Sequence, residues 1–194
     1  MRPRETEISE IHAFPAVMAE SVKCAVLPLA GGPMHAPTGT VISVRVAEEV
    51  LKIPYRVYYD KQLLIKATHI PSETGLISLC LGTRHCDGLI REQCLRRLLT
   101  FDQKWTVPFV VQLLGEYVIE VVQPIHERFN EEVEAKYVEF FRQNSQYCQY
   151  LEQRAVSYWN EYYRFRFAKH KDYPAVKALA ALRKAAGHAM TMSA

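Results

Sequence analysis

The sequence predicts a mainly α protein of the α+β class, in which a small β-containing lobe precedes a bundle of about five helices around one long kinked helix. Residues 107–144 repeat apolar side chains three or four positions apart, as one buried face of an α-helix requires. Helical patterns also fill residues 72–99 and 146–186, whereas short alternating apolar runs lie before residue 70. We therefore expect a β-containing lobe with an N-terminal arm over 1–70 and a helical domain over 71–194.

Short strands are expected in the N-terminal lobe. The run CAVLPLA from Cys24 and the run TVISVRV from Thr40 are typical of strands. Residues 55–67 are typical of a hairpin or an extended arm. Residues 5–14 allow a short amphipathic helix. The glycine-containing segment 31–39 lacks the Gly-Lys-Ser/Thr of a phosphate-binding loop, so we expect a plain connection there.

The helical domain should contain an antiparallel helix pair, the long helix and two further helices. The pair turns at Asp87-Gly88. Pro124 should kink the long helix near Glu120, because proline removes a hydrogen bond and clashes with the preceding turn. A further helix is expected over 146–167, followed by an alanine-rich helix that ends at Gly187.

Composition predicts a folded cytoplasmic protein. The 194 residues are 49% hydrophobic and 23% charged, which is ordinary for a globular protein, and the net charge of +3 implies nucleic acid or lipid only if a local patch exists. Five cysteines, mostly in helical patterns, favour reduced thiols. No apolar leader follows Met1, and the most apolar window, 107–122, contains charges and is shorter than the ~20 residues of a membrane span. We expect no membrane partner.

Residues 76–99, LISLCLGTRHCDGLIREQCLRRLL, contain Asp87 at a helix–helix turn and Arg91 in the next helical turn. In this pattern the segment resembles a single HEAT-type helical hairpin, in which such a pair locks adjacent helices. The resemblance implies a style of packing and no activity. Together with residues 107–122, the segment also looks like small bacterial helical proteins of uncharacterised function.

A metal site is one possibility at the turn of this hairpin. Cys80, His85, Cys86 and Cys94 are of the residue types that zinc prefers. No Cys-x-x-Cys pair is present, and Cys80 and Cys94 fall at apolar helical positions, so core thiols and a turn histidine are the simpler interpretation. His85 and Cys86 remain the candidate ligands, and we expect no metal or other cofactor.

Two carboxylates on the most apolar helix are the catalytic candidates. Glu116 and Glu120 lie one turn apart, with His126 further along, and carboxylates that face a pocket can act in acid–base chemistry. A di-iron bundle would need Glu-x-x-His pairs, and the sequence has none. The alternative is a solvated or arginine-paired polar stripe.

The segment from Tyr158 to Tyr173, YWNEYYRFRFAKHKDY, interleaves aromatic rings with cations. Rings that stack on bases beside cations that bind phosphates are suited to single-stranded nucleic acid. The candidate binding residues are Tyr163, Arg164, Arg166, Phe167, Lys169 and Lys171. In the alternative interpretation half of the rings are buried, and the cations pair with acidic residues of the long helix, namely Glu127, Glu131 and Glu134.

Since no catalytic motif is recognisable, we first expect a non-catalytic protein-interaction or adaptor protein of the bacterial cytoplasm. Its partner would be another protein or a second copy of the chain, bound through helical surfaces. The alternatives are a single-stranded RNA-binding protein that uses residues 158–173 and an enzyme that uses Glu116 and Glu120.

Overall fold

The computed structural model describes residues 8–29 and 37–191, with side chains up to residue 187. In these residues it has nine α-helices and one two-stranded antiparallel sheet, which confirms a mainly α fold with a small β part. The α-helices are α1 (Ala19–Val26), α2 (Lys61–Thr68), α3 (Glu73–Gly82), α4 (Gly88–Leu98), α5 (Val107–Val111), α6 (Ile119–Glu131), α7 (Ala135–Gln143), α8 (Ser145–Tyr158) and α9 (Pro174–Thr191). Shorter turns are the 3₁₀ segments η1 (Ser9–Ala13), η2 (Ala16–Met18), η3 (Lys104–Thr106), η4 (Gln112–Gly115) and η6 (His170–Asp172), and the π-helical turn η5 (Trp159–Tyr163).

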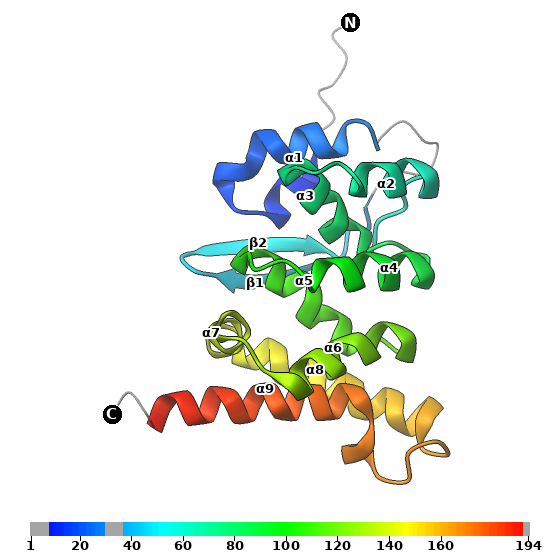
Figure 1. Ribbon diagram of the computed structural model, residues 1–194, viewed down its shortest axis with the longest axis vertical. Coiled ribbons are helices and arrows are strands. Elements are labelled where there is room, and N and C mark those ends of the chain that lie inside the picture. Colours follow the sequence, from blue (N-terminus) through cyan, green and yellow to red (C-terminus); the bar gives the residue numbers. More distant parts are fainter. Residues whose placement is uncertain (1–7, 30–36, 192–194) are drawn as a thin grey trace, which may run out of the picture.

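The elements form a stack of layers along the long axis of the molecule. Figure 1 shows α1, α2 and α3 at one end, the β hairpin with α4 and α5 in the middle, and α6 to α9 at the other end. One contiguous core of buried apolar side chains runs through all three layers. None of the helices in the described ranges is both long and apolar enough to cross a membrane.

The sheet is a single hairpin of β1 (Val41–Val46) and β2 (Glu49–Pro54). The register runs from Val41 opposite Pro54 to Val46 opposite Glu49. Val44, Leu51 and Ile53 are buried on one face while Arg45, Val50 and Lys52 are exposed, as the alternation of side chains along a strand requires. The predicted strand from Thr40 is therefore confirmed.

Two other parts of the predicted β lobe are helical, so those predictions were wrong. The first three residues of the run from Cys24 end α1, where Val22 and Val26 fall one turn apart on the buried face, and residues 27–29 form a turn. Residues 62–67 belong to α2, which Asp60 caps by accepting hydrogen bonds from the following backbone N–H groups. In both runs the apolar residues also fit a helical spacing, so alternation alone does not distinguish a strand from a helix there. The segment 31–39 and the start of the helix expected over 5–14 lie largely outside the described residues.

The single long helix predicted over 107–144 is instead four consecutive segments, α5, η4, α6 and α7. The chain is interrupted at 116–118 and again at 132–134, and Glu116 is extended with φ −93° and ψ 153°. Pro124 lies inside α6, and the first interruption comes before it. The apolar spacing was correct because every segment turns its apolar face to the same core, but spacing alone does not show where a helix stops.

The last two helices also differ from their predicted bounds. The helix expected over 146–167 changes after Tyr158 into the π-helical turn η5, and α9 continues through Gly187 to Thr191. Gly187 keeps helical geometry and does not end the helix. The space beside it is open, since a Cβ atom there would have no contact within 4 Å outside its own helix backbone.

The helical part packs closely on the β-containing part. Helices α1 and α2 both contact α3, across the boundary predicted at residue 70. Asn144, at the end of α7, accepts a hydrogen bond from the Arg45 backbone N–H at 2.7 Å and donates one to the Arg45 backbone oxygen at 2.8 Å. The division into a lobe over 1–70 and a helical domain over 71–194 stays a prediction.

Candidate functional site

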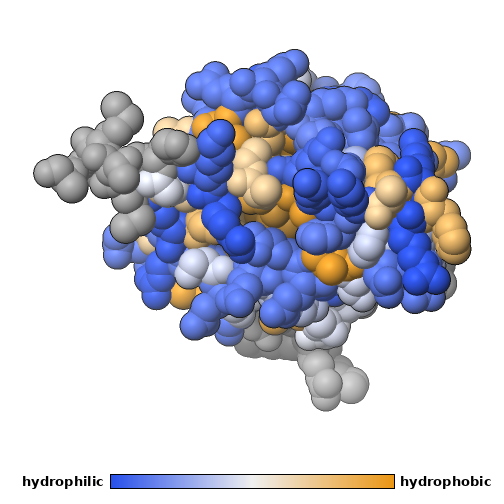
Figure 2. Space-filling view, turned by 90° about the horizontal axis from the view of Figure 1, so that it is seen from below, coloured by the Kyte–Doolittle hydropathy of each residue, from blue (hydrophilic) through white to orange (hydrophobic). Residues whose placement is uncertain are grey.

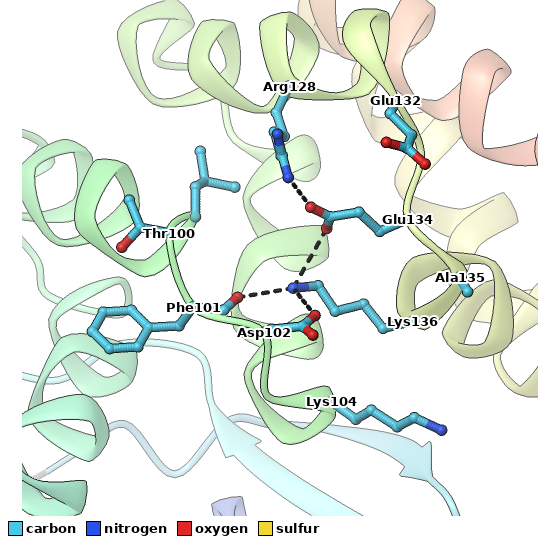
Figure 3. Close-up of a pocket in the computed structure, with 10 residues that line it drawn as sticks. Thr100, Phe101, Asp102, Lys104, Arg128, Glu132, Glu134, Ala135 and Lys136 are labelled. Atoms are coloured by element: carbon cyan, nitrogen blue, oxygen red, sulfur yellow. Dashed lines mark hydrogen bonds and ion pairs between the residues drawn. The ribbon is translucent and has the colours of Figure 1, made fainter.

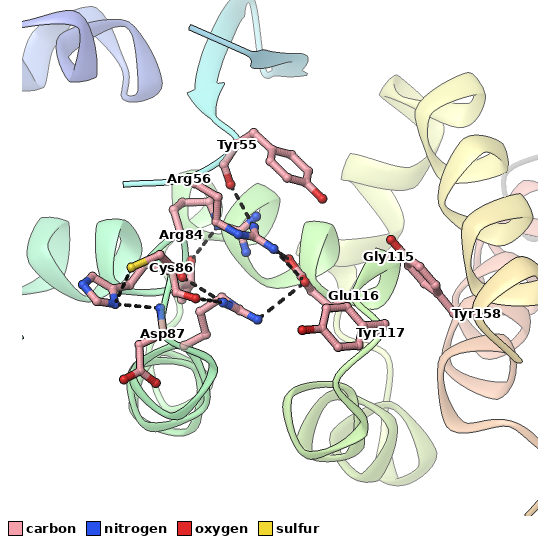
Figure 4. Close-up of polar contacts among 12 residues, drawn as sticks. Tyr55, Arg56, Arg84, Cys86, Asp87, Gly115, Glu116, Tyr117 and Tyr158 are labelled. Carbon is pink, nitrogen blue, oxygen red and sulfur yellow. Dashed lines mark hydrogen bonds and ion pairs between the residues drawn. The ribbon is translucent and has the colours of Figure 1, made fainter. Parts of the chain in front are cut away.

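Charged side chains from four parts of the chain meet in the middle of the molecule (Figure 4). Arg56 follows β2, Arg84 follows α3, Arg91 belongs to α4, and Glu116 stands at the interruption after η4. We call these four residues the arginine cluster. The interruption directs Glu116 toward the arginines, because an extended residue after a helical turn projects its side chain away from the helix face.

Glu116 is the acceptor at the centre of the arginine cluster. The Nη2 atom of Arg56 lies 2.8 Å from both of its carboxylate oxygens, and the Nη2 atom of Arg91 lies 3.7 Å from one of them. The side chains of Glu116 and Arg91 are each only 3% exposed. Burial lowers the pKa of Arg91, and Glu116 opposes that effect. One buried carboxylate is thus shared between two guanidinium groups.

Arg84 is the least satisfied member of the cluster. Its side chain is fully buried, its Nε donates weakly to the Thr83 hydroxyl at 3.4 Å, and its two terminal nitrogens have no hydrogen-bond partner among the described residues. Burial lowers its pKa to about 10, although Glu116 acts in the opposite direction. A buried cation without partners is unfavourable, so this part of the interior is short of negative charge.

A fifth charged residue, Arg154 of α8, borders the cluster and organises three tyrosines. It donates to the hydroxyls of Tyr55 and Tyr150 at 3.0 Å each, to that of Tyr158 at 2.7 Å, and to the Gly115 backbone oxygen at 3.2 Å. Burial by itself would lower the pKa of Arg154, but the hydrogen bonds to Tyr150 and Tyr55, together with the electrostatic interactions with Tyr55 and Tyr158, raise it. The guanidinium therefore stays charged and holds side chains from two elements together.

The basic aromatic segment, residues 158–173, forms the connection between α8 and α9 at one end of the molecule (Figure 1). Phe165 is 92% exposed and Tyr162 59% exposed. On the face seen in Figure 2, hydrophobic side chains lie beside strongly hydrophilic ones at the edge where this connection lies. The segment therefore presents two large aromatic rings to the solvent.

The six predicted nucleic-acid-binding residues fall into two groups. Tyr163 and Phe167 are half-buried against the buried ring of Tyr173, at centroid distances of 5.1 and 5.8 Å. The exposed group consists of Arg164, Arg166, Lys169 and Lys171. The guanidiniums of Arg164 and Arg166 lie over the rings of Phe165 and Phe167 at 5.3 and 5.5 Å, and none of the four cations forms an ion pair with a described residue.

The pairing expected between these cations and the acidic residues of the long helix is wrong. Glu134 bonds to Arg128 and lies 3.4 Å from Lys136, Glu131 pairs with Arg128, and Glu127 accepts from Gln123. Because the predicted helix is interrupted at 132–134, its acidic residues meet cations of their own neighbourhood. The cations of the basic aromatic segment therefore remain available to another molecule.

Of the two candidate metal ligands, His85 is bonded inside the protein and Cys86 is exposed. His85 is buried, its Nδ1 accepts from the Asp87 backbone N–H at 3.0 Å, and its Nε2 lies 3.0 Å from the Tyr59 backbone oxygen. This arrangement fits a neutral ring that carries its proton on Nε2. Cys86 Sγ is 3.9 Å from His85 Nδ1. Within 8–29 and 37–191, no group of three or more His, Cys, Asp or Glu residues is placed to hold a metal ion.

The three catalytic candidates have different surroundings. Glu116 is buried among arginines, whereas Glu120 is exposed. His126 is half-buried, and burial followed by the charge of Lys177 lowers its pKa. No hydrogen bond or ion pair joins any two of the candidates in the described part of the chain. The three residues proposed for acid–base catalysis therefore do not form a common site.

A polar cavity of about 840 Å³ lies between the α4–η3 connection and the start of α7 (Figure 3). Its central cation is Lys136, which bonds to the Phe101 backbone oxygen at 2.8 Å, to Asp102 at 3.1 Å and to Glu134 at 3.4 Å. Arg128 bonds to the same glutamate. These charges satisfy one another, so the cavity does not select a ligand by charge.

Glu116 was a candidate from the sequence, but no local pattern connected it with arginines. Arg91 stands in a helical run with apolar neighbours and Arg84 in the turn before it, so neither position indicated from the sequence that the arginine is buried. The HEAT-type resemblance paired Arg91 with Asp87. In the structure Arg91 instead donates to the backbone oxygens of His85 and Cys86, and Asp87 caps α4 and pairs with Lys61.

No protein-family model, no curated protein and no solved structure matches this chain.

Proposed function

We propose that this protein is a non-catalytic binding protein whose basic aromatic segment, residues 158–173, binds single-stranded nucleic acid. The observation that supports it is the set of four cations in this segment that have no ion-pair partner in the described residues, next to exposed aromatic rings. Cations without partners on a surface are suited to a polyanion, and exposed rings are suited to unpaired bases.

The segment provides both kinds of contact in a short length. Phe165 stands between Arg164 and Arg166, so a base that stacks on the ring would bring its phosphates close to both guanidinium groups. Tyr162 lies 6.0 Å from the half-exposed ring of Tyr117 and extends the aromatic surface. Duplex nucleic acid hides its base faces, which is why we propose a single strand.

Fluorescence anisotropy with a short labelled oligouridylate tests the proposal. Removing one cation that binds a phosphate should make the slope of log K against log salt shallower by about 0.7, so Arg164→Gln with Arg166→Gln should reduce its magnitude by about 1.4. Phe165→Ala should weaken binding about 5- to 150-fold, because a base could no longer stack there. Lys66→Gln, on the exposed surface of α2, is the matched control and should change neither quantity.

Absence of binding to the oligouridylate at low salt would remove this proposal. The protein-interaction hypothesis would then be the better one. Val17 and Leu27 flank α1 and are 91% and 62% exposed, which favours a partner at the opposite end of the molecule from the basic aromatic segment.

A further inference from the structure

We infer that the hydroxyl groups of Tyr55, Tyr150 and Tyr158 around Arg154 form a binding site for one phosphate group. The identity of the ligand as a nucleic-acid phosphate rests on the proposed function, whereas the site itself rests on hydrogen bonding and charge. Tyr55 follows β2 and the other two tyrosines belong to α8, so the site closes where the β hairpin meets the last layer of helices.

The protons of the three hydroxyls are free to be donated. Each of the three hydroxyl oxygens accepts a hydrogen bond from Arg154, at 2.7 to 3.0 Å. A tyrosine hydroxyl has one proton, and an oxygen that accepts from a guanidinium keeps that proton for donation elsewhere. No acceptor for these three protons occurs among the hydrogen bonds of the described residues. Three donors polarised by one cation therefore lack acceptors.

Positive charge is in excess behind the hydroxyls. Arg56, Arg84, Arg91 and Arg154 contribute four positive charges and Glu116 one negative charge, an excess of three. The Arg56 guanidinium lies 4.5 Å from the centroid of the Tyr55 ring, which connects the two groups of residues. Arg84 is fully buried with both terminal nitrogens unpartnered. An anion at the hydroxyls would reduce this imbalance.

The hydroxyls are also continuous with the aromatic surface. Tyr158 is the first residue of the basic aromatic segment, and its ring lies 6.1 Å from Tyr117 and 6.2 Å from Tyr162. Figure 4 shows Tyr55, Tyr117 and Tyr158 around the same side of Glu116. A base stacked on the exposed rings of Tyr117 and Tyr162 would have a phosphate within reach of the hydroxyls.

A phosphate group suits these donors because the three hydroxyls surround one guanidinium, and each charged phosphate oxygen can accept more than one hydrogen bond. We name phosphate rather than a carboxylate because it is the anion that the proposed function supplies. The same phosphate chemistry can come from a nucleic-acid backbone or from a free phosphate ion, and the experiment separates the two sources.

The test is the triple variant Tyr55→Phe, Tyr150→Phe, Tyr158→Phe, which removes the three hydroxyls and keeps the rings. The probes are inorganic phosphate, measured by calorimetry against chloride at equal ionic strength, and the labelled oligouridylate, measured by anisotropy. One hydroxyl donated to a charged group is worth roughly tenfold in affinity, so each single variant should lose about tenfold and the triple variant more than about a hundredfold. Tyr58→Phe removes an exposed hydroxyl outside this surface and should change neither affinity.

The outcomes separate the two proposals. If the wild type binds both probes and the triple variant binds neither tightly, the site and the proposed function are supported. If the triple variant binds both as the wild type does, the phosphate site is wrong and nucleic-acid binding stands. If the wild type binds phosphate through the hydroxyls but no oligouridylate, the site stands and the proposed function falls. Binding of neither probe by the wild type overturns both. Arg154 stays in place in every variant. Circular dichroism of the triple variant and of the single variants shows whether a loss of affinity reflects unfolding instead.

Discussion

Replacing Glu116 with glutamine would test whether the arginine cluster is held together by one carboxylate. The substitution keeps the size of the side chain and one acceptor oxygen, but it removes the negative charge. Arg56 lies 2.8 Å from both carboxylate oxygens and Arg91 3.7 Å from one. After the change, three guanidinium groups would face one another without a counter-ion.

The expected loss of stability follows from the burial of these groups. Removing one partner of a buried ion pair typically costs about 3–5 kcal/mol, because the other charge stays buried. Glu116 and Arg91 are each 3% exposed and Arg84 is fully buried, so this range applies, whereas Arg56, at 14%, keeps some access to water. In a chain of 194 residues, 1 kcal/mol shifts Tm by roughly 2–4 °C. Tm should therefore fall by about 6–20 °C.

Urea unfolding at neutral pH, followed by circular dichroism, measures this loss directly. Glu120→Gln is the matched control, because Glu120 is exposed and its substitution should change the free energy of unfolding by less than about 0.5 kcal/mol. A loss below about 1 kcal/mol for Glu116→Gln, with an unchanged m-value, would refute the view that the cluster depends on this carboxylate.

Two further substitutions test other parts of the structure. Asn144→Ala removes two hydrogen bonds to the Arg45 backbone, so it should lower the free energy of unfolding by about 1–3 kcal/mol. It should also speed hydrogen exchange at the Arg45 N–H. Unchanged exchange at this N–H would argue against the link between α7 and β1. His126 has its pKa lowered from 6.5 by burial and by Lys177, so near and below pH 6.5 the unfolded chain binds more protons and stability falls as pH decreases. His126→Gln should flatten the dependence of stability on pH between about 5 and 7, and parallel curves for variant and wild type would contradict this sign.

The fold class was predictable because helical spacing and burial coincide throughout the second half of the chain. Val121, Ile125 and Phe129 are buried at the predicted spacing, although they belong to a shorter helix than expected. The spacing could not show the interruption at 116–118, since apolar residues on both sides of it face one core. Gly115 ends η4 just before the interruption, and a Cβ atom there would lie 2.7 Å from the Leu151 side chain, a tertiary contact that spacing does not reveal.

The candidate site was less predictable because its residues meet only through tertiary contacts. Arg56 and Glu116 are sixty positions apart in the chain, and Arg154 reaches Tyr55 over ninety-nine. No local pattern encodes such a meeting. The aromatic and cationic residues of the basic aromatic segment were visible in the sequence. The sequence could not show that the acidic residues of α6 pair with other side chains, so it did not predict that the cations of the segment are unpaired.

Glu116 has opposite effects on folding and on the inferred phosphate site. A second carboxylate in the cluster would pair Arg84 and stabilise the fold, but it would reduce the excess charge that draws an anion to the three hydroxyls. With no carboxylate, the attraction would be stronger and the buried arginines would repel one another. An arginine cluster with a single acid therefore combines one carboxylate that stabilises the fold with the excess positive charge that the inferred phosphate site would use.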